Sequence, residues 1–277
     1  MKGNAGRFSK GGTIGLLFLL AAGSQSPAQA QHPVRWTRAV GPPSRQALRA
    51  KLLKPPARKP RSDRIYFDHG DTGREIRTCA DYLRALKHDW GGSGNTYEQS
   101  IESFFKDECD VMWLVLAAKP SRVSYVRGFK LDESALDLLP PSLSFNLSAE
   151  QEEAADQAEQ SGLSWKKYNP EMKLVGKKLN EITVDEDPFS RVILEIKAFG
   201  DFNGDGVEDV LLFRASYLTQ GTARDYTPVI LTRLTPGGRF KAFEVDDKAI
   251  QNAAARVMRT GSGKPGRKVR QEHQATN

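Results

Sequence analysis

The chain has 277 residues, enough for one large or two modest domains, and its 41 Lys and Arg against 34 Asp and Glu give a net charge of +7. Residues 32–64 carry ten basic residues and one acid, and residues 256–277 carry six and one, whereas residues 65–255 carry 22 basic and 32 acidic residues. The basic pI is therefore a property of the ends of the chain. It does not indicate a nucleic-acid-binding core.

The first 30 residues have the pattern of a secretory signal peptide. Lys2, Arg7 and Lys10 form a basic region, residues 14–22 are apolar, and Ala28-Gln29-Ala30 fits a small-x-small cleavage site. The apolar run is too short to cross a bilayer comfortably, and no later stretch is apolar enough for a transmembrane helix. We expect an exported protein, periplasmic or secreted.

Residues 31–64 are rich in Pro and Arg, which predicts a disordered basic linker in which 44–53 form at most a turn or two of helix. Residues 256–277 predict a disordered basic tail. Such arms favour contact with anionic surfaces such as phospholipid, lipopolysaccharide or acidic wall polymers, although solvated tethers have the same composition. The folded domain is expected to span 65–255.

Two cysteines, Cys79 and Cys109, are expected to form a disulfide if the chain is exported to an oxidising compartment. Apolar residues at helical spacing predict one helix over 78–90 and a second from 96 to about 119. The bridge would then join two antiparallel helices across a Gly-rich turn. A third helix, opened by Ser148 and ended by Gly162, is acidic and expected to be exposed, so the helical part of the domain covers 78–162.

One strand is predicted within the helical part, at 123–129. After it, alternating patterns predict four more strands, at 191–199, 209–217, 227–234 and 239–245. The last four suit an antiparallel meander over 191–245. The predicted fold class is therefore α+β, with a disulfide-stapled helical part followed by a β-meander.

The connection between the first two strands of the meander, Asp201-Phe-Asn-Gly-Asp-Gly-Val-Glu-Asp209, spaces oxygen-bearing side chains as Ca²⁺ requires. Gly206 permits a sharp turn with positive φ. An oxygen-only set disfavours zinc and copper. The expected ligands are the side chains of Asp201, Asn203, Asp205 and Asp209 and the carbonyl of Val207.

This loop is not an EF-hand, because Leu212 stands at the position of the closing Glu and the residues after Asp209 read as a strand. It resembles the calcium loop of the integrin-type FG-GAP repeat, where the same Asp-x-Asn-x-Asp-Gly-x-x-Asp pattern leads into a strand. The resemblance covers about 195–218 and occurs once, so it does not imply a multi-bladed propeller. It implies a calcium-binding exported protein.

Catalytic signatures for metalloproteases, serine hydrolases and P-loop enzymes are absent from the sequence. We therefore expect a non-catalytic binding or envelope-structural role with Ca²⁺ as the cofactor. Two alternatives stay open. Ser93-Gly94-Asn95-Thr96-Tyr97 is similar to the short motif of bacterial lysozyme inhibitors, which implies an inhibitor-like or adhesin-like module. A hydrolase could instead use an unrecognised site around Asp68, His69 and Asp71.

Overall fold

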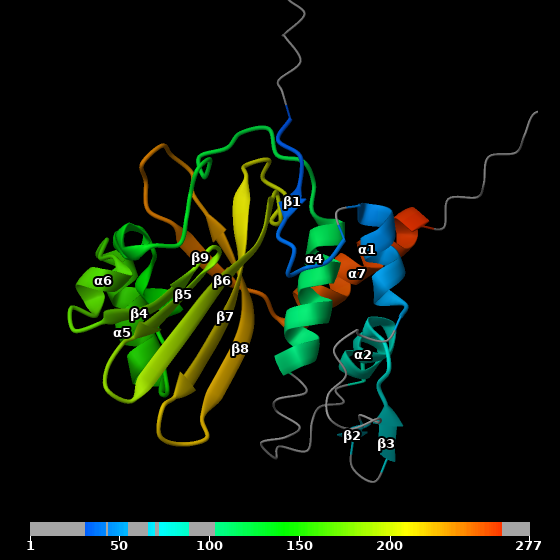
Figure 1. Ribbon diagram of the computed structural model, residues 1–277, viewed down its shortest axis with the longest axis horizontal. Helices are drawn as coiled ribbons and strands as arrows, with labels where there is room; N and C mark the ends of the chain where they lie inside the picture. Colours follow the sequence, from blue (N-terminus) through cyan, green and yellow to red (C-terminus); the bar gives the residue numbers. More distant parts are fainter. Residues whose placement is uncertain (1–30, 43, 55–65, 70–71, 89–102, 262–277) are drawn as a thin grey trace, which may run out of the picture. The chain divides into compact units, whose positions relative to one another are not determined.

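The computed structural model describes residues 31–42, 44–54, 66–69, 72–88 and 103–261. Its main feature is an antiparallel sheet in the order β4-β5-β6-β7-β8-β9, with β1 paired to β6 as an extra strand (Figure 1). A separate hairpin is formed by β2 and β3. The strands are β1 Arg35–Trp36, β2 Tyr66–His69, β3 Thr72–Glu75, β4 Lys173–Lys178, β5 Glu181–Asp185, β6 Ser190–Gly200, β7 Asp209–Leu218, β8 Arg224–Thr232 and β9 Lys241–Glu244.

Helices lie on both faces of this sheet. On one side in Figure 1 are α1, α4 and α7, and on the other are α5 and α6. The helical segments are α1 Arg45–Leu52, α2 Cys79–Leu86, the π-helix η1 Lys106–Asp110, α4 Val111–Ala117, the 3₁₀ turns η2 Glu133–Asp137 and η3 Pro141–Leu143, α5 Ala149–Gln160, α6 Trp165–Tyr168 and α7 Asp247–Gly261. The predicted α+β class and the antiparallel sheet are confirmed.

The long central strands are buried on both faces because successive side chains alternate between two hydrophobic cores. In β7, Leu211 and Phe213 face the core under α1, α2, α4 and α7, whereas Val210 and Leu212 face the core under α5 and α6. The predicted meander is thus correct in its pairing. The structure adds β4 and β5 at one edge, where the three lysines of β4 and an exposed surface weaken the apolar alternation.

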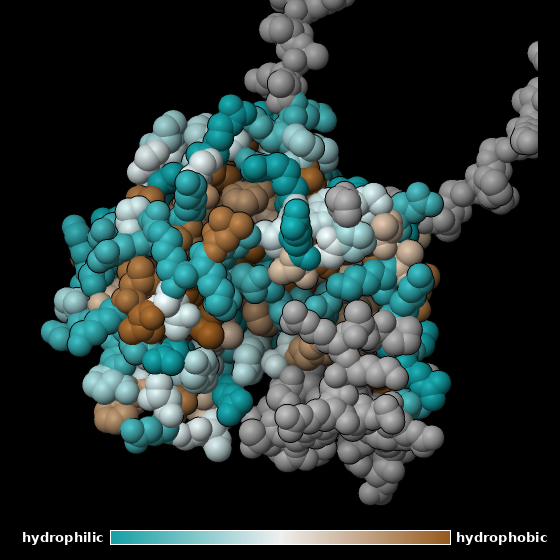
Figure 2. Space-filling view, viewed as in Figure 1, coloured by the Kyte–Doolittle hydropathy of each residue, from teal (hydrophilic) through white to brown (hydrophobic). Residues whose placement is uncertain are grey.

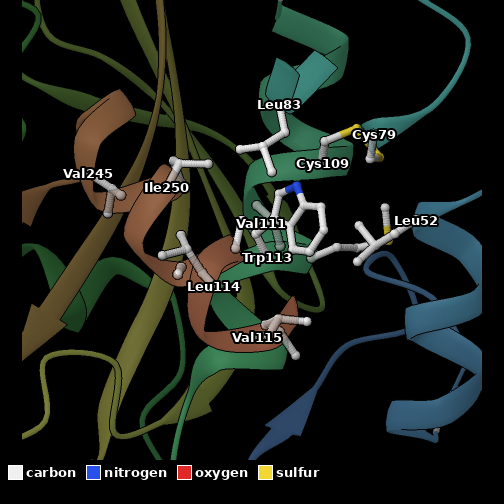
Figure 3. Close-up of a cluster of buried hydrophobic side chains, with 14 of the residues drawn as sticks. Leu52, Cys79, Leu83, Cys109, Val111, Trp113, Leu114, Val115, Val245 and Ile250 are labelled. Atoms are coloured by element: carbon white, nitrogen blue, oxygen red, sulfur yellow. A yellow bond between two sulfur atoms is a disulfide. The ribbon is translucent and has the colours of Figure 1, made fainter. Parts of the chain in front are cut away.

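The predicted disulfide between Cys79 and Cys109 is present. Cys79 is the first residue of α2, which Thr78 caps reciprocally with Asp81, and Cys109 lies in η1. The Gly-rich turn expected between the two predicted helices lies outside the described residues. Figure 3 shows the bridge beside the apolar side chains of the core under α1 and α4.

The expectation of a disordered linker does not hold for the described residues 31–42 and 44–54, and the helical turns expected at 44–53 are present as α1. β1 pairs with β6, and α1 begins after the cap Ser44 and buries Leu48 and Leu52 fully against α4. These two leucines are four residues apart and share one helix face, a signal hidden by the surrounding Arg and Pro. At the other end, α7 continues to Gly261 and buries Val257, so the expected basic tail begins inside a helix.

The predicted strand at 123–129 is also wrong. Only Val123 forms a β-bridge there, and its partner is Val207 in the candidate calcium loop. The segment after α4 therefore runs past the loop without becoming a regular strand of the sheet. The 3₁₀ turn η2 follows the cap Asp132, and the exposed acidic helix predicted after Ser148 is confirmed as α5.

Candidate calcium loop

The loop 201–209 connects β6 to β7 and is organised by its own side chains. Asp201 accepts hydrogen bonds from the Gly204 N–H at 2.6 Å and the Gly206 N–H at 3.1 Å. Asp205 accepts from the Val207 N–H at 2.7 Å, and its own N–H donates to the Asn203 side chain at 2.9 Å. These bonds hold four predicted ligands of the loop in a tight coil.

Glycine is required at the centre of this coil. Gly206 has φ of +85°, in the left-handed region, and a Cβ placed there would lie 2.6 Å from the Arg122 guanidinium. Gly204 is also left-handed, with φ of +93°, but has open space around it. The sequence prediction of a sharp turn at Gly206 is confirmed.

Asp209 differs from the other carboxylates of the loop. It is fully buried, and its Oδ2 accepts from the Phe202 N–H at 3.0 Å. Its Oδ1 is buried and makes no hydrogen bond within the described part of the chain. Burial raises the pKa of Asp209 from 3.8 to about 6, although the Phe202 N–H and the nearby Thr232 hydroxyl favour the carboxylate.

A buried carboxylate oxygen without a partner is costly, since an unsatisfied charged group keeps its full desolvation penalty. The bond from Phe202 and the repulsion from Asp205 both show that this carboxylate lies against the loop. The oxygen therefore suits a cation bound in the loop. No sequence signal indicated that Asp209 would be the most buried of the predicted ligands.

The remaining expected ligands differ from one another in burial. Asp201 is buried, whereas Asn203 and Asp205 are exposed at the turn. In the backbone bridge between Val123 and the loop, the Gly206 carbonyl accepts a hydrogen bond and the Glu208 N–H donates one. The Val207 carbonyl makes no hydrogen bond in this bridge. Across the described ranges, no three His, Cys, Asp or Glu side chains are assembled into a metal-binding group.

The loop is also a junction of three chain segments. The Lys119 and Asp201 backbones exchange hydrogen bonds at 3.0 and 3.1 Å, and the Arg122 N–H donates to the Gly206 carbonyl at 2.7 Å. These contacts tie the segment after α4 to the loop from both sides. Figure 1 shows β1 and this segment next to the β6–β7 end of the sheet.

Glu208 completes the junction. It is buried, and its carboxylate accepts from the Arg35 guanidinium at 3.0 Å and the Ser124 hydroxyl at 2.5 Å. Sequence reasoning gave Glu208 no role because its partners are 173 and 84 residues away. With both oxygens engaged, Glu208 holds β1 in place rather than serving as a ligand.

The structure adds no evidence for the two alternative functions, the lysozyme-inhibitor-like module and the hydrolase. Asp68 and His69 lie on β2, while Asp71 and the whole motif from Ser93 to Tyr97 lie outside the described residues.

No helix in the described ranges is both long and apolar enough to cross a membrane. No protein family, no curated protein and no solved structure matches this chain.

Proposed function

We propose that the loop 201–209 binds Ca²⁺, and that the ion stabilises an exported, non-catalytic binding or envelope-structural protein. The observation that carries this proposal is the buried Oδ1 of Asp209, which has no hydrogen-bond partner in the described chain and lies against a coil of oxygen-bearing residues. A hard cation would supply the missing partner.

The residues fit calcium in their chemistry. The proposed ligands are Asp201, Asn203, Asp205 and Asp209 with the Val207 carbonyl, which together offer only oxygens. Backbone N–H groups already engage most of these side chains, but each carboxylate oxygen has a second lone pair. Coordination thus does not require those hydrogen bonds to break.

The junction gives the ion a structural role. Since the segment after α4 and the β1 strand both attach to the loop or its neighbour Glu208, ordering the loop would stabilise long-range contacts as well as one turn. Weak affinity, near about 10⁻⁴–10⁻³ M, is usual for exported calcium modules. Binding at 10 to 100 times the dissociation constant would add about 1.4–2.7 kcal/mol to the free energy of unfolding.

Thermal unfolding of the full chain with Ca²⁺ or with EGTA tests the proposal, with isothermal titration to measure affinity. We expect Ca²⁺ to raise Tm and Asp205→Asn to reduce the response. Asp187→Asn is a matched control, because Asp187 is an exposed carboxylate that accepts two backbone N–H bonds in another turn. An equal Ca²⁺ response in all three proteins, or none in the wild type, would refute calcium binding by this loop.

The cellular role is a proposal from sequence features. The signal-like first 30 residues support export to the periplasm or beyond, and the basic ends support contact with an anionic envelope polymer or surface. Pull-down from envelope extract with Ca²⁺ or EGTA tests both the partner and its ion dependence. Recovery of the same proteins by a chain that carries Asp205→Asn would show that partner binding does not depend on calcium.

A further inference from the structure

A buried lysine joins the central sheet to the helical part of the chain. Hydrophilic residues cover much of the face shown in Figure 2, where water can solvate them, whereas Lys197 on β6 is only 3 % exposed. Its ammonium lies 2.6 Å from a carboxylate oxygen of Asp107 in η1 and 2.7 Å from one of Glu195 on the same strand. The centroid of the Phe213 ring is 5.3 Å away. Lysines are rarely buried unless they are paired, and this one has two acidic partners beside an apolar wall.

The two acidic partners of Lys197 are held differently. The ammonium donates a hydrogen bond to Glu195, whereas the Oδ1 of Asp107 is buried and makes no hydrogen bond within the described part of the chain, although Nζ is 2.6 Å away. A C=O bond is about 1.2 Å long, so the Asp107 Cγ lies within about 4 Å of Nζ. Reacting atoms in a near-attack geometry are about 3–3.5 Å apart. A shift of about 1 Å or less would therefore place the nitrogen against this carbon.

The charged form of this triad is costly where it lies. Burial lowers the pKa of Lys197, but the charges of Asp107 and Glu195 outweigh it and raise the pKa overall, so the resting state is an ion pair. The attraction within a buried ion pair repays the cost of removing its charges from water only when the geometry is excellent. Joining one ammonium and one carboxylate as a neutral amide would remove both charges. Fixed proximity favours this reaction, because effective molarities of oriented groups reach about 10⁵–10⁸ M.

We propose that Lys197 and Asp107 form an intramolecular isopeptide bond, with Glu195 as the proton-transfer residue. The Lys197 Nζ forms a bond to the Asp107 Cγ, and one C–O bond of that carboxyl group breaks. Glu195 passes two protons in turn from the nitrogen to the departing oxygen, which leaves as water, and Glu195 ends as the carboxylate it was. One ammonium and one carboxylate thus give one amide and one water, and no other reactant is consumed.

The amide would join η1 covalently to the centre of the sheet. Asp107 is two residues from Cys109, whose disulfide to Cys79 already ties η1 to α2. With both bonds in place, α2, η1 and β6 form one cross-linked unit. The segment η1 is a π-helix, a conformation that is frequent at functional sites. The amide resists reducing agents, unlike the disulfide, and its formation does not depend on calcium.

Intact-mass spectrometry of the full chain, denatured and with its disulfide reduced, tests the proposal. We expect a mass about 18 Da below that of the sequence between the observed ends, the mass of one water. Peptide mapping should find residues 107 and 197 in one branched peptide. Lys178 is an internal control, because its ammonium also lies 2.6 Å from a carboxylate, that of Glu181, but on an exposed hairpin. It should be recovered as a free lysine.

Variants assign the roles within the triad. Lys197→Arg and Asp107→Ala should have their full sequence mass, whereas Lys178→Arg should keep the deficit. In Glu195→Gln, the fraction of bonded chain after a pulse of cell-free synthesis should rise at least about tenfold more slowly, since proton transfer by a side chain contributes about 10²–10⁴-fold. An unchanged rate would remove the role of Glu195. Thermal unfolding verifies the fold of each variant, and the wild-type result is independent of it.

Three results would overturn the proposal. The first is a wild-type chain of full mass, and the second is a deficit that maps away from Lys197 and Asp107. The third is a deficit that mild alkali reverses, because the Asp205-Gly206 pair can also lose water as a cyclic succinimide, which alkali hydrolyses while an isopeptide bond survives. Purifying the protein in EGTA should leave the deficit unchanged, so the outcome does not depend on whether the loop 201–209 binds calcium.

Discussion

Replacing Asp209 with Asn separates the energetic cost of a buried charge from its use as a metal ligand. The Asn oxygen can still accept from the Phe202 N–H, which lies 3.0 Å from Asp209 Oδ2. The new amide nitrogen replaces the Oδ1 oxygen and can donate to the nearby, buried Thr232 hydroxyl. In the absence of calcium, the variant should therefore be the more stable protein.

The magnitude follows from the pKa of Asp209, which burial raises from 3.8 to about 6. Between about pH 4 and pH 6 the folded protein binds more protons than the unfolded chain, so the free energy of unfolding falls as the pH rises. The full difference corresponds to about 3 kcal/mol above pH 7. At pH 4 this contribution is mostly absent, because the folded carboxyl is protonated and the carboxyl of the unfolded chain is only a little over half ionised.

Urea unfolding of wild type and Asp209→Asn at pH 7.5 and pH 4, each with EDTA, measures this effect. We expect the variant to be more stable by up to about 3 kcal/mol at pH 7.5 and nearly equal at pH 4. Adding Ca²⁺ at pH 7.5 should stabilise only the wild type, and its calcium affinity should weaken as the pH falls through 6, because the ligand must lose its proton. A variant that is less stable than wild type in EDTA at pH 7.5, or that has the same pH dependence, would refute the reasoning.

Three further changes test the fold. Cys79→Ser with Cys109→Ser should lower the free energy of unfolding by about 3–4 kcal/mol for a 30-residue separation, measured by urea unfolding against the oxidised, disulfide-bonded wild type; no loss would show that the bridge constrains little. Gly206→Ala should cost about 1 kcal/mol or more, because of its φ of +85°, and an unchanged Tm would contradict the left-handed turn. Leu48→Ala should cost about 2–5 kcal/mol, whereas Leu53→Ala, at an exposed position, should cost far less; equal effects would argue against a packed α1.

The sequence by itself determined the features that depend on neighbouring residues. Strands β6 and β7 were predictable because the side-chain period of two is a local signal, and the helix caps at Thr78 and Ser148 were predictable because their hydrogen bonds span three residues. The conformation of the loop 201–209 also depends on residues that are neighbours in the sequence. Its oxygen atoms and its left-handed Gly206 follow from spacing alone.

Only the tertiary structure decided how those parts are used. The membership of β1 and α1 in the fold depends on partners far along the chain, and their Arg-rich and Pro-rich composition masked two buried leucines. In the loop, spacing made the four side chains appear equivalent, but the packing of β7 buries Asp209 and leaves Asp205 in solvent. Burial sets the pKa and the unsatisfied oxygen, and burial is a property of the assembled cores rather than of any short stretch of sequence.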